Sequence, residues 1–223
     1  MNRAITITSL SVLFALCAIT AAQQQQDDPK GPQRAIKLFN GENLDGWVWF
    51  SHDKNVKMED VWSVRDGKLH CKGKPLGYIR TEDDYESYVL TLQIRHVTPG
   101  NGGILLRADD EPIEGNWPKS VEAQGMSGAL GDIWNIGEFP MKTAPDRTKG
   151  RHTRKSGPDI ERPVGEWNDY VIILDGGNLT LIVNGVVQNE AADIDVRPGK
   201  ICLQSEGSEY EFRNIVLVPL ERK

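Results

Sequence analysis

The chain has 223 residues, and its 26 Lys and Arg residues are outnumbered by 32 Asp and Glu residues, which gives a formal net charge of −6 at pH 7. This acidic balance disfavours nucleic acid as a partner, because the phosphate backbone attracts basic surfaces. The length excludes several large domains and suits one well-buried domain behind an N-terminal leader.

The N-terminal segment has the layout of a secretory signal peptide. Within residues 1–22 a single cation, Arg3, precedes an apolar run from Leu10 to Ile19, and two alanines end the segment. The run is too short for a membrane-spanning helix with its flanks, and no later segment is apolar enough to span a membrane. We therefore expect the mature protein to be secreted or periplasmic.

The mature chain that remains has two simple features. Residues 23–34 are rich in Gln, Asp, Pro and Gly, which predicts a disordered linker, and residues 35–221 then form a single domain. Cys71 and Cys202 are the cysteines left after cleavage. In an exported protein such a pair indicates either one disulfide or two thiols in separate strands, and the sequence leaves both readings open.

The domain is predicted to be all-β. Short apolar runs are separated by Asn-Gly and Asp-Gly dipeptides, which adopt the positive φ of tight hairpins. Residues 88–95 alternate between two faces, and 167–174 leads into 179–183 as a hairpin. About a dozen such strands need two packed antiparallel sheets, because one sheet of that size would leave an apolar face in water. We therefore predict a two-sheet sandwich.

One long segment interrupts this rhythm. Residues 137–166 are rich in Pro, Gly, Lys and Arg and show no apolar period, and loops of this length in a compact domain are usually functional or disordered. The cations of its central part are Lys142, Arg147, Lys149, Arg151, Arg154 and Lys155. Two readings stay open, a solvated loop and a lid or anion-binding segment.

Residues 120–124, Ser-Val-Glu-Ala-Gln, carry the clearest chemical signal. In a strand, Glu122 and Gln124 share the face opposite the buried valine and alanine. The preceding segment 101–107 reads as a second strand, so Arg107 stands beside Glu122 if the two strands lie close in the sheet. An acid, an amide and a cation on one surface are typical of a sugar site.

Aromatic and polar residues nearby complete the predicted site. Trp117 and Trp134 offer apolar plates for the C–H face of a sugar, whereas we expect Trp62 and Trp167 to be core residues. The remaining substrate-binding candidates are His152, which lies in the basic loop, and Glu206, which shares its strand phase with Gln204.

A metal site is the least defined part of this prediction. Asp132 follows a glycine turn, so it either coordinates a hard cation such as calcium together with Glu122 or simply starts a strand. No histidine cluster has metal-ligand spacing, and the sequence contains neither a Ser-His-Asp order nor a CxxC motif. No cofactor is therefore firmly predicted, and a divalent cation stays open.

An ordered set of short motifs resembles the 3-keto-disaccharide hydrolase family. The motifs are 37–47 (KLFNGENLDGW), 61–64 (VWSV), 101–104 (NGGI), 122–124 (EAQ), 128–132 (GALGD), 167–168 (WN), 184–185 (NG) and 212–215 (FRNI). The resemblance implies a concanavalin A-like jelly-roll sandwich, which agrees with the fold deduced from alternation. The chain departs from the family pattern at Gly102, where Ser is frequent, and in the 137–166 loop.

The resemblance implies an oligosaccharide or glycoside substrate whose glucose-type ring carries a ketone at C3. That ketone acidifies the proton on C2, so a base can remove it and expel the C1 oxygen, after which water adds back. We expect Glu122 to be the base or a metal ligand, Arg107 to stabilise the enolate charge, and Gln124 to position hydroxyl groups.

Two other functions compete with this reading. A non-catalytic carbohydrate-binding module would use the same sandwich and the same tryptophans without any chemistry. An ordinary glucanase would need a second carboxylate two residues beyond Glu122, and Gln124 occupies that position. The paired acid and cation favour an enzyme over the binding module.

Overall fold

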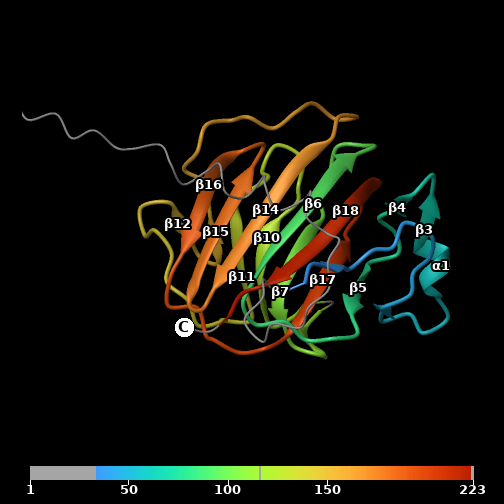
Figure 1. Ribbon diagram of the computed structural model, residues 1–223, viewed down its shortest axis with the longest axis horizontal. Helices are drawn as coiled ribbons and strands as arrows, with labels where there is room; N and C mark the ends of the chain where they lie inside the picture. The colour runs from blue at the N-terminus through green and yellow to red at the C-terminus, as the bar shows by residue number, and fades with distance from the viewer. Residues whose placement is uncertain (1–33, 116, 222–223) are drawn as a thin grey trace, which may run out of the picture. The chain divides into compact units, whose positions relative to one another are not determined.

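Two antiparallel sheets packed face to face form the fold, which confirms the predicted all-β sandwich (Figure 1). The computed structural model describes residues 34–115 and 117–221. The predicted signal peptide and, apart from residue 34, the predicted linker lie outside these residues. Among the residues described, no helix has the length and apolar character to cross a bilayer.

The first sheet has the strand order β16-β15-β14-β6-β18-β4-β3, and β1 also pairs with β18. Its strands are β1 (Ile36–Lys37), β3 (Trp62–Arg65), β4 (Lys68–Cys71), β6 (Tyr88–His96), β14 (Asn168–Asp175), β15 (Asn178–Val183), β16 (Val186–Ala191) and β18 (Tyr210–Pro219). The predicted hairpin turn at Asn184 and Gly185 joins β15 to β16, and both residues take the positive φ that a tight turn needs.

The second sheet has the order β12-β13-β11-β10-β7-β17-β5-β2. Its strands are β2 (Trp47–Phe50), β5 (Gly77–Thr81), β7 (Gly103–Ala108), β10 (Ser120–Gln124), β11 (Ile133–Ile136), β12 (Thr148–Lys149), β13 (His152–Thr153) and β17 (Lys200–Ser205). A separate hairpin of β8 (Pro112–Glu114) and β9 (Trp117–Pro118) and a short helix α1 (Met58–Val61) complete the described elements.

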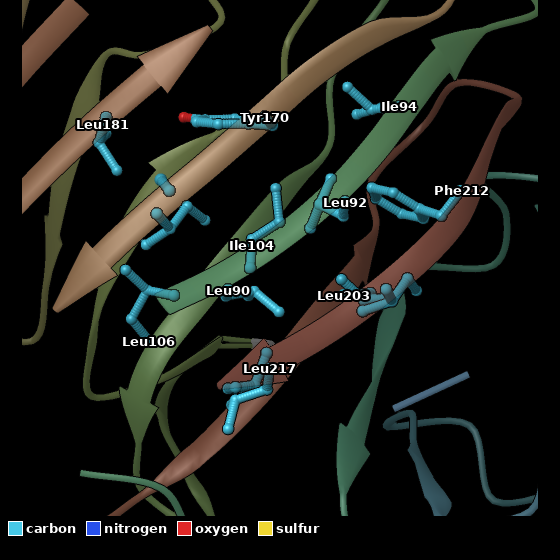
Figure 2. Packing of buried hydrophobic residues seen from close by; sticks show 14 of the residues in the cluster. Leu90, Leu92, Ile94, Ile104, Leu106, Tyr170, Leu181, Leu203, Phe212 and Leu217 are labelled. Carbon is cyan, nitrogen blue, oxygen red and sulfur yellow. The ribbon is translucent and has the colours of Figure 1, made fainter. Parts of the chain in front are cut away.

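The main core fills the space between the sheets (Figure 2). Every second residue of β6 is buried, from Tyr88 to Ile94, as the alternation predicts. Figure 2 shows the side chains that meet there from both sheets, among them Leu90, Leu92, Ile104, Leu106, Tyr170, Leu203 and Phe212. Period-2 burial of this kind fixes which face of each strand points away from the core.

The outer face of the second sheet carries a smaller apolar cluster. Its buried members are Tyr78, Leu105, Ala108, Ile136 and Cys202, and Phe50 and Trp117 pack against them. Trp117 belongs to the β8–β9 hairpin, and its ring lies 6.3 Å from that of Tyr78. This cover explains why β7, β10 and β17 are buried at every position rather than at every second one.

Two expectations about single side chains are settled by this arrangement. Cys71 in β4 and Cys202 in β17 are both free and buried, so the disulfide reading is wrong and the reading of two thiols in separate strands is confirmed. Of the two tryptophans predicted to be core residues, Trp62 is fully buried, which confirms the prediction. Trp167 is not a core residue, because it is half-buried between the guanidinium groups of Arg95 and Arg213, 4.8 Å and 4.1 Å from its ring centroid.

Candidate active site

The outer face of the second sheet brings three of the predicted site residues, Glu122, Trp134 and His152, into one row. Glu122 in β10 pairs with Trp134 in β11, and Trp134 pairs with His152 in β13. On its other side Glu122 pairs with Leu105 in β7. Residues that pair directly across antiparallel strands point to the same face, so the carboxyl group stands between an aromatic plate and an apolar side chain.

A glycine makes room for the carboxyl group of Glu122. A Cβ atom on Gly103 would lie 2.4 Å from Oε1 of Glu122 and 2.3 Å from Oε1 of Gln204. Side chains from β10 and β17 therefore bend over β7 from both sides and share the space above Gly103. Any larger residue at this position would displace one of them, which is the close approach that glycine permits.

Several buried polar atoms around Gly103 and the preceding Gly102 have no hydrogen-bond partner among the described residues. They are Oε1 of Glu122, Oε1 of Gln204, Oε2 of Glu206, Oδ1 of Asn101 and the hydroxyl of Tyr210. The Tyr210 ring reaches the neighbouring Gly102, on which a Cβ atom would lie 3.0 Å from the hydroxyl oxygen. Buried polar groups without partners are costly, and a cluster of them is typical of a site that a polar ligand completes.

The two carboxyl groups of this cluster hold their protons unusually tightly. Burial, with a smaller contribution from the nearby Glu206, raises the pKa of Glu122 to about 8 against the opposing effect of Arg151. Burial likewise raises the pKa of Glu206 to about 7, against the effects of Arg151 and Asn101. Because the two groups interact, they titrate as a pair, and the pair retains a proton near neutral pH.

The cation of the site comes from the basic loop. The guanidinium carbon of Arg151 lies 5.3 Å from the centroid of the Trp134 ring, and the residue influences the pKa values of both Glu122 and Glu206. The side chain is exposed, so it can move toward a ligand. The concentration of cations in the 137–166 loop was the sequence signal for this residue, but it did not single out Arg151.

The expectation that Arg107 stands beside Glu122 is wrong. β7 and β10 do pair, but β7 carries an extra residue opposite β17 at this point, and Arg107 takes a φ of 49°. The bulge turns the side chain away from the outer face. Its guanidinium donates hydrogen bonds of 2.6 to 3.0 Å to the backbone carbonyls of Glu86, Gly176 and Asp195, so it ties loops together.

Trp134 is held in place by a histidine and an aspartate. The His152 ring stacks on Trp134 with centroids 4.4 Å apart and planes 11° apart. Nε2 of His152 lies 2.6 Å from Oδ2 of Asp132, and the amide of Lys155 donates to Oδ1 of Asp132 at 2.8 Å. Asp132 and His152, both predicted to bind substrate, therefore act by positioning the aromatic plate.

The contacts of Asp132 with His152 and Lys155 do not support the prediction that Asp132 and Glu122 together coordinate a calcium ion. Both carboxylate oxygens of Asp132 already have partners within the protein. Within residues 34–115 and 117–221, no group of three or more His, Cys, Asp or Glu side chains is arranged to hold a metal ion.

Gln124 and Trp117 lie at the margins of the site. Gln124 is buried on the same face as Glu122, and its Oε1 accepts a hydrogen bond from the amide of Met126 at 2.8 Å, which closes the turn after β10. Trp117 is half-buried on the Tyr78 side of the sheet. Sequence reasoning missed Asn101 and Tyr210 as site residues and missed the partner role of Gln204. Tyr210 and Gln204 lie in β18 and β17, which are remote in sequence from β10.

Comparison with known proteins agrees with this picture. Residues 34–218 match the family described as the 3-keto-alpha-glucoside-1,2-lyase-like domain, which confirms the predicted family. No functionally curated protein is significantly similar in sequence. These findings support a carbohydrate-active function.

Solved structures show the same fold. A candidate glycosyl hydrolase from Parabacteroides distasonis is 23% identical, with a TM-score of 0.60 over 84% of this chain and 100% of that one. A second from the same organism is 19% identical, with a TM-score of 0.63 over 84% and 94% of the two chains. A β-glucanase of Bacillus licheniformis is 11% identical, with a TM-score of 0.57 over 86% and 100%. The predicted jelly-roll sandwich of the glucanase type is thereby confirmed.

Proposed function

Because this chain belongs to the family of 3-keto-alpha-glucoside-1,2-lyase-like domains, we propose that it is an exported enzyme that cleaves the glycosidic bond of 3-keto-glycosides. The single observation that carries the proposal is the pair formed by the buried Glu122 and the half-buried Glu206, which retains a proton near neutral pH under the influence of the Arg151 guanidinium. An elimination needs this combination of base, acid and cation.

The ketone at C3 determines the reaction. It acidifies the proton on C2, and Glu122, the more basic carboxylate of the pair, removes that proton. The electrons of the C2–H bond form an enolate whose negative oxygen is stabilised by Arg151, which replaces Arg107 in this role. The C1–O bond then breaks as a C1–C2 double bond forms, and its electron pair leaves with the oxygen of the aglycone.

The carboxyl pair keeps its proton count through the elimination. In the reactive one-proton form Glu122 is ionised and Glu206 carries the proton, which is the less populated arrangement because Glu122 has the higher pKa. Glu122 gains the proton from C2, while Glu206 gives its proton to the departing oxygen. The pair therefore ends with one proton, as it began. In the hydration step Glu206 takes a proton from the water whose oxygen adds at C1, and Glu122 returns its proton to C2, which restores the starting form of the pair. Trp134 supports the apolar face of the ring.

Substitution of Glu122 tests the proposal directly. Glu122→Gln keeps the shape of the side chain but removes the base, so the variant should fold normally and fail to cleave a 3-keto-glucoside. The wild-type protein in heavy water should introduce deuterium at C2 of the product. Cleavage by Glu122→Gln at the wild-type rate would remove Glu122 from the mechanism, and sugar binding without any product would favour the carbohydrate-binding module instead.

A further inference from the structure

A cleft of about 780 Å³ opens at the end of the sandwich where β2 and β3 lie. β3 is the last strand of the first sheet and β2 the last of the second, and α1 and residues 42–46 complete the walls. Three strands separate β2 from β10, and Figure 1 shows α1 and β3 at one side of the molecule, away from β10 and β11. The motifs 37–47 and 61–64 meet in this cleft, and the proposed reaction uses neither of them.

Four carboxylates surround the cleft without a cation to balance them. They are Glu42, Asp45, Glu59 and Glu82, and all four are exposed. Among the residues described, none of them forms an ion pair, and no Lys, Arg or His lines the cleft. Like charges gathered around one opening produce a negative potential that attracts a cation. The described residues contain no group of three carboxylates arranged for a metal ion, so we consider an organic cation.

Two hydrogen-bond donors that line the same cleft lack an acceptor. Trp62 is fully buried and packs edge-on against Tyr210, with ring centroids 6.3 Å apart, but no described residue accepts a hydrogen bond from its Nε1. Oγ of Ser63, the next residue of β3, is likewise buried without a partner in the described part of the chain. A buried donor without an acceptor costs free energy, so both groups favour a ligand that brings acceptor oxygens.

The loop that carries Glu42 and Asp45 is held in one conformation by two asparagines. Oδ1 of Asn40 accepts hydrogen bonds from the amides of Glu42 and Asn43 at 2.8 and 3.0 Å. Oδ1 of Asn43 accepts a third from the amide of Asp45 at 3.1 Å. A wall that is ordered before the ligand arrives lowers the conformational entropy lost on binding.

The ligand that fits these walls combines charge, acceptor oxygens and apolar surface. Leu44, Met58 and Val64 line the cleft, are half-buried and pack against the main core, so they offer apolar surface beside the polar groups. An alkyl amine carries the charge but no acceptor, and a neutral sugar carries acceptors but no charge. An amino sugar brings an ammonium group, hydroxyl and ring oxygens and C–H groups on one small ring, which suits a cleft of this volume.

We propose that this cleft is a second carbohydrate site and that it binds an amino sugar. The ammonium group lies among the four carboxylates, and oxygens of the sugar accept hydrogen bonds from Nε1 of Trp62 and Oγ of Ser63. The C–H groups of the ring contact Leu44 and Val64. The inference goes beyond the proposed function and does not depend on it, because no residue of the acid pair takes part.

Calorimetry on the full wild-type chain tests the site with two matched sugars. A β-1,4-linked glucosamine disaccharide and cellobiose differ by an ammonium group in place of a hydroxyl group on each ring. The glucosamine disaccharide should bind about 5- to 10-fold more tightly at low salt, and added salt should reduce this preference. The double variant Glu42→Gln/Glu59→Gln should abolish most of the preference, whereas Ser63→Ala should weaken both sugars about 3-fold.

The matched control is the double variant Glu166→Gln/Glu190→Gln, which removes the same charge from exposed positions outside the cleft and should keep the preference. Equal binding of the two disaccharides, or equal losses in the two double variants, would overturn the site. Binding of a linear triamine as tight as that of the amino sugar would show that charge alone is recognised and would also overturn it. Displacement of the amino sugar by methyl 3-keto-glucoside would place it in the active site instead. If the protein cleaves no 3-keto-glucoside but the preference depends on Glu42 and Glu59, the proposed reaction fails and the amino-sugar site stands.

Discussion

Glu122 and Gln204 come from strands on opposite sides of β7, and their side-chain oxygens meet above Gly103. The two residues lie 82 positions apart in the sequence (204 − 122). Neither oxygen has a hydrogen-bond partner among the residues that the structure describes. Because Gly103 has no side chain, a small polar chamber remains above β7, and the side-chain oxygens of Glu122 and Gln204 line it.

Gly103→Ala should close this chamber. The new Cβ atom would lie within 2.4 Å of both side-chain oxygens, so Glu122 and Gln204 must move apart. We expect the rate on a 3-keto-glucoside to fall at least about 100-fold, because small misplacements of catalytic groups are this costly. Gly177→Ala is the control, since a Cβ atom there meets nothing closer than 3.4 Å. A normal rate for Gly103→Ala would show that the chamber is not the active site.

The raised pKa of Glu122 should make stability depend on pH. Its pKa rises from 4.5 in the unfolded chain to about 8 in the folded one, so the folded state binds the proton more tightly. The free energy of unfolding should therefore be highest below pH 4.5 and fall as the pH rises toward 8, because the unfolded state binds fewer protons in this window.

Glu122→Gln should remove much of that pH dependence. At about pH 9 the variant should melt about 5 °C or more above the wild-type protein, and at about pH 4 the two should melt together. Glu190→Gln, at an exposed position of β16, serves as the matched control. Parallel melting curves for wild type and Glu122→Gln across the whole pH range would contradict the burial of an ionisable carboxyl group at this position.

Arg151→Ala should reduce turnover without weakening the fold. The side chain is exposed, and removing one group that stabilises developing negative charge commonly lowers kcat about 100- to 1,000-fold. The melting temperature should hardly change. Arg154→Ala removes another exposed cation of the same loop and should keep nearly full activity. Equal losses in the two variants would mean that the loop acts through its overall charge.

Arg107→Met should show the opposite pattern. It removes the guanidinium that binds the carbonyls of Glu86, Gly176 and Asp195, so we expect a loss of about 2–4 kcal/mol in the free energy of unfolding. The activity of the protein that remains folded should stay close to the wild-type value. Chemical denaturation and initial rates on the same sample measure both effects. A stable but inactive variant would return Arg107 to the active site.

The pH dependence of turnover reports on the carboxyl pair. The proposed elimination uses the pair with one proton, and burial brings the pKa values of Glu206 and Glu122 to about 7 and about 8. The plot of kcat/KM against pH should therefore be a narrow bell with its maximum between these values. Glu206→Gln should abolish the bell, whereas Glu209→Gln, which removes a half-buried carboxylate paired with His70 before β18, should preserve it. A flat profile in the wild-type protein would exclude an acid–base pair.

The sequence by itself determined the two-sheet architecture and the face of β10 on which Glu122 lies. Alternation along β6 and β14 identified the buried face of each strand, and the Asn-Gly and Asp-Gly dipeptides identified the turns. The same period placed Glu122 on the outer face of β10. These features depend on residues close together in the chain, so their physical cause can be seen in a short segment.

The tertiary structure alone decided which cation and which second acid join Glu122. A bulge of one residue in β7 turned Arg107 toward the loops beneath the sheet, and a long loop without periodicity brought Arg151 to Trp134. Pairing of β17 with β7 placed Gln204 and Glu206 beside Glu122. Strand register, bulges and loop closure depend on contacts between distant segments, and no local pattern encodes them.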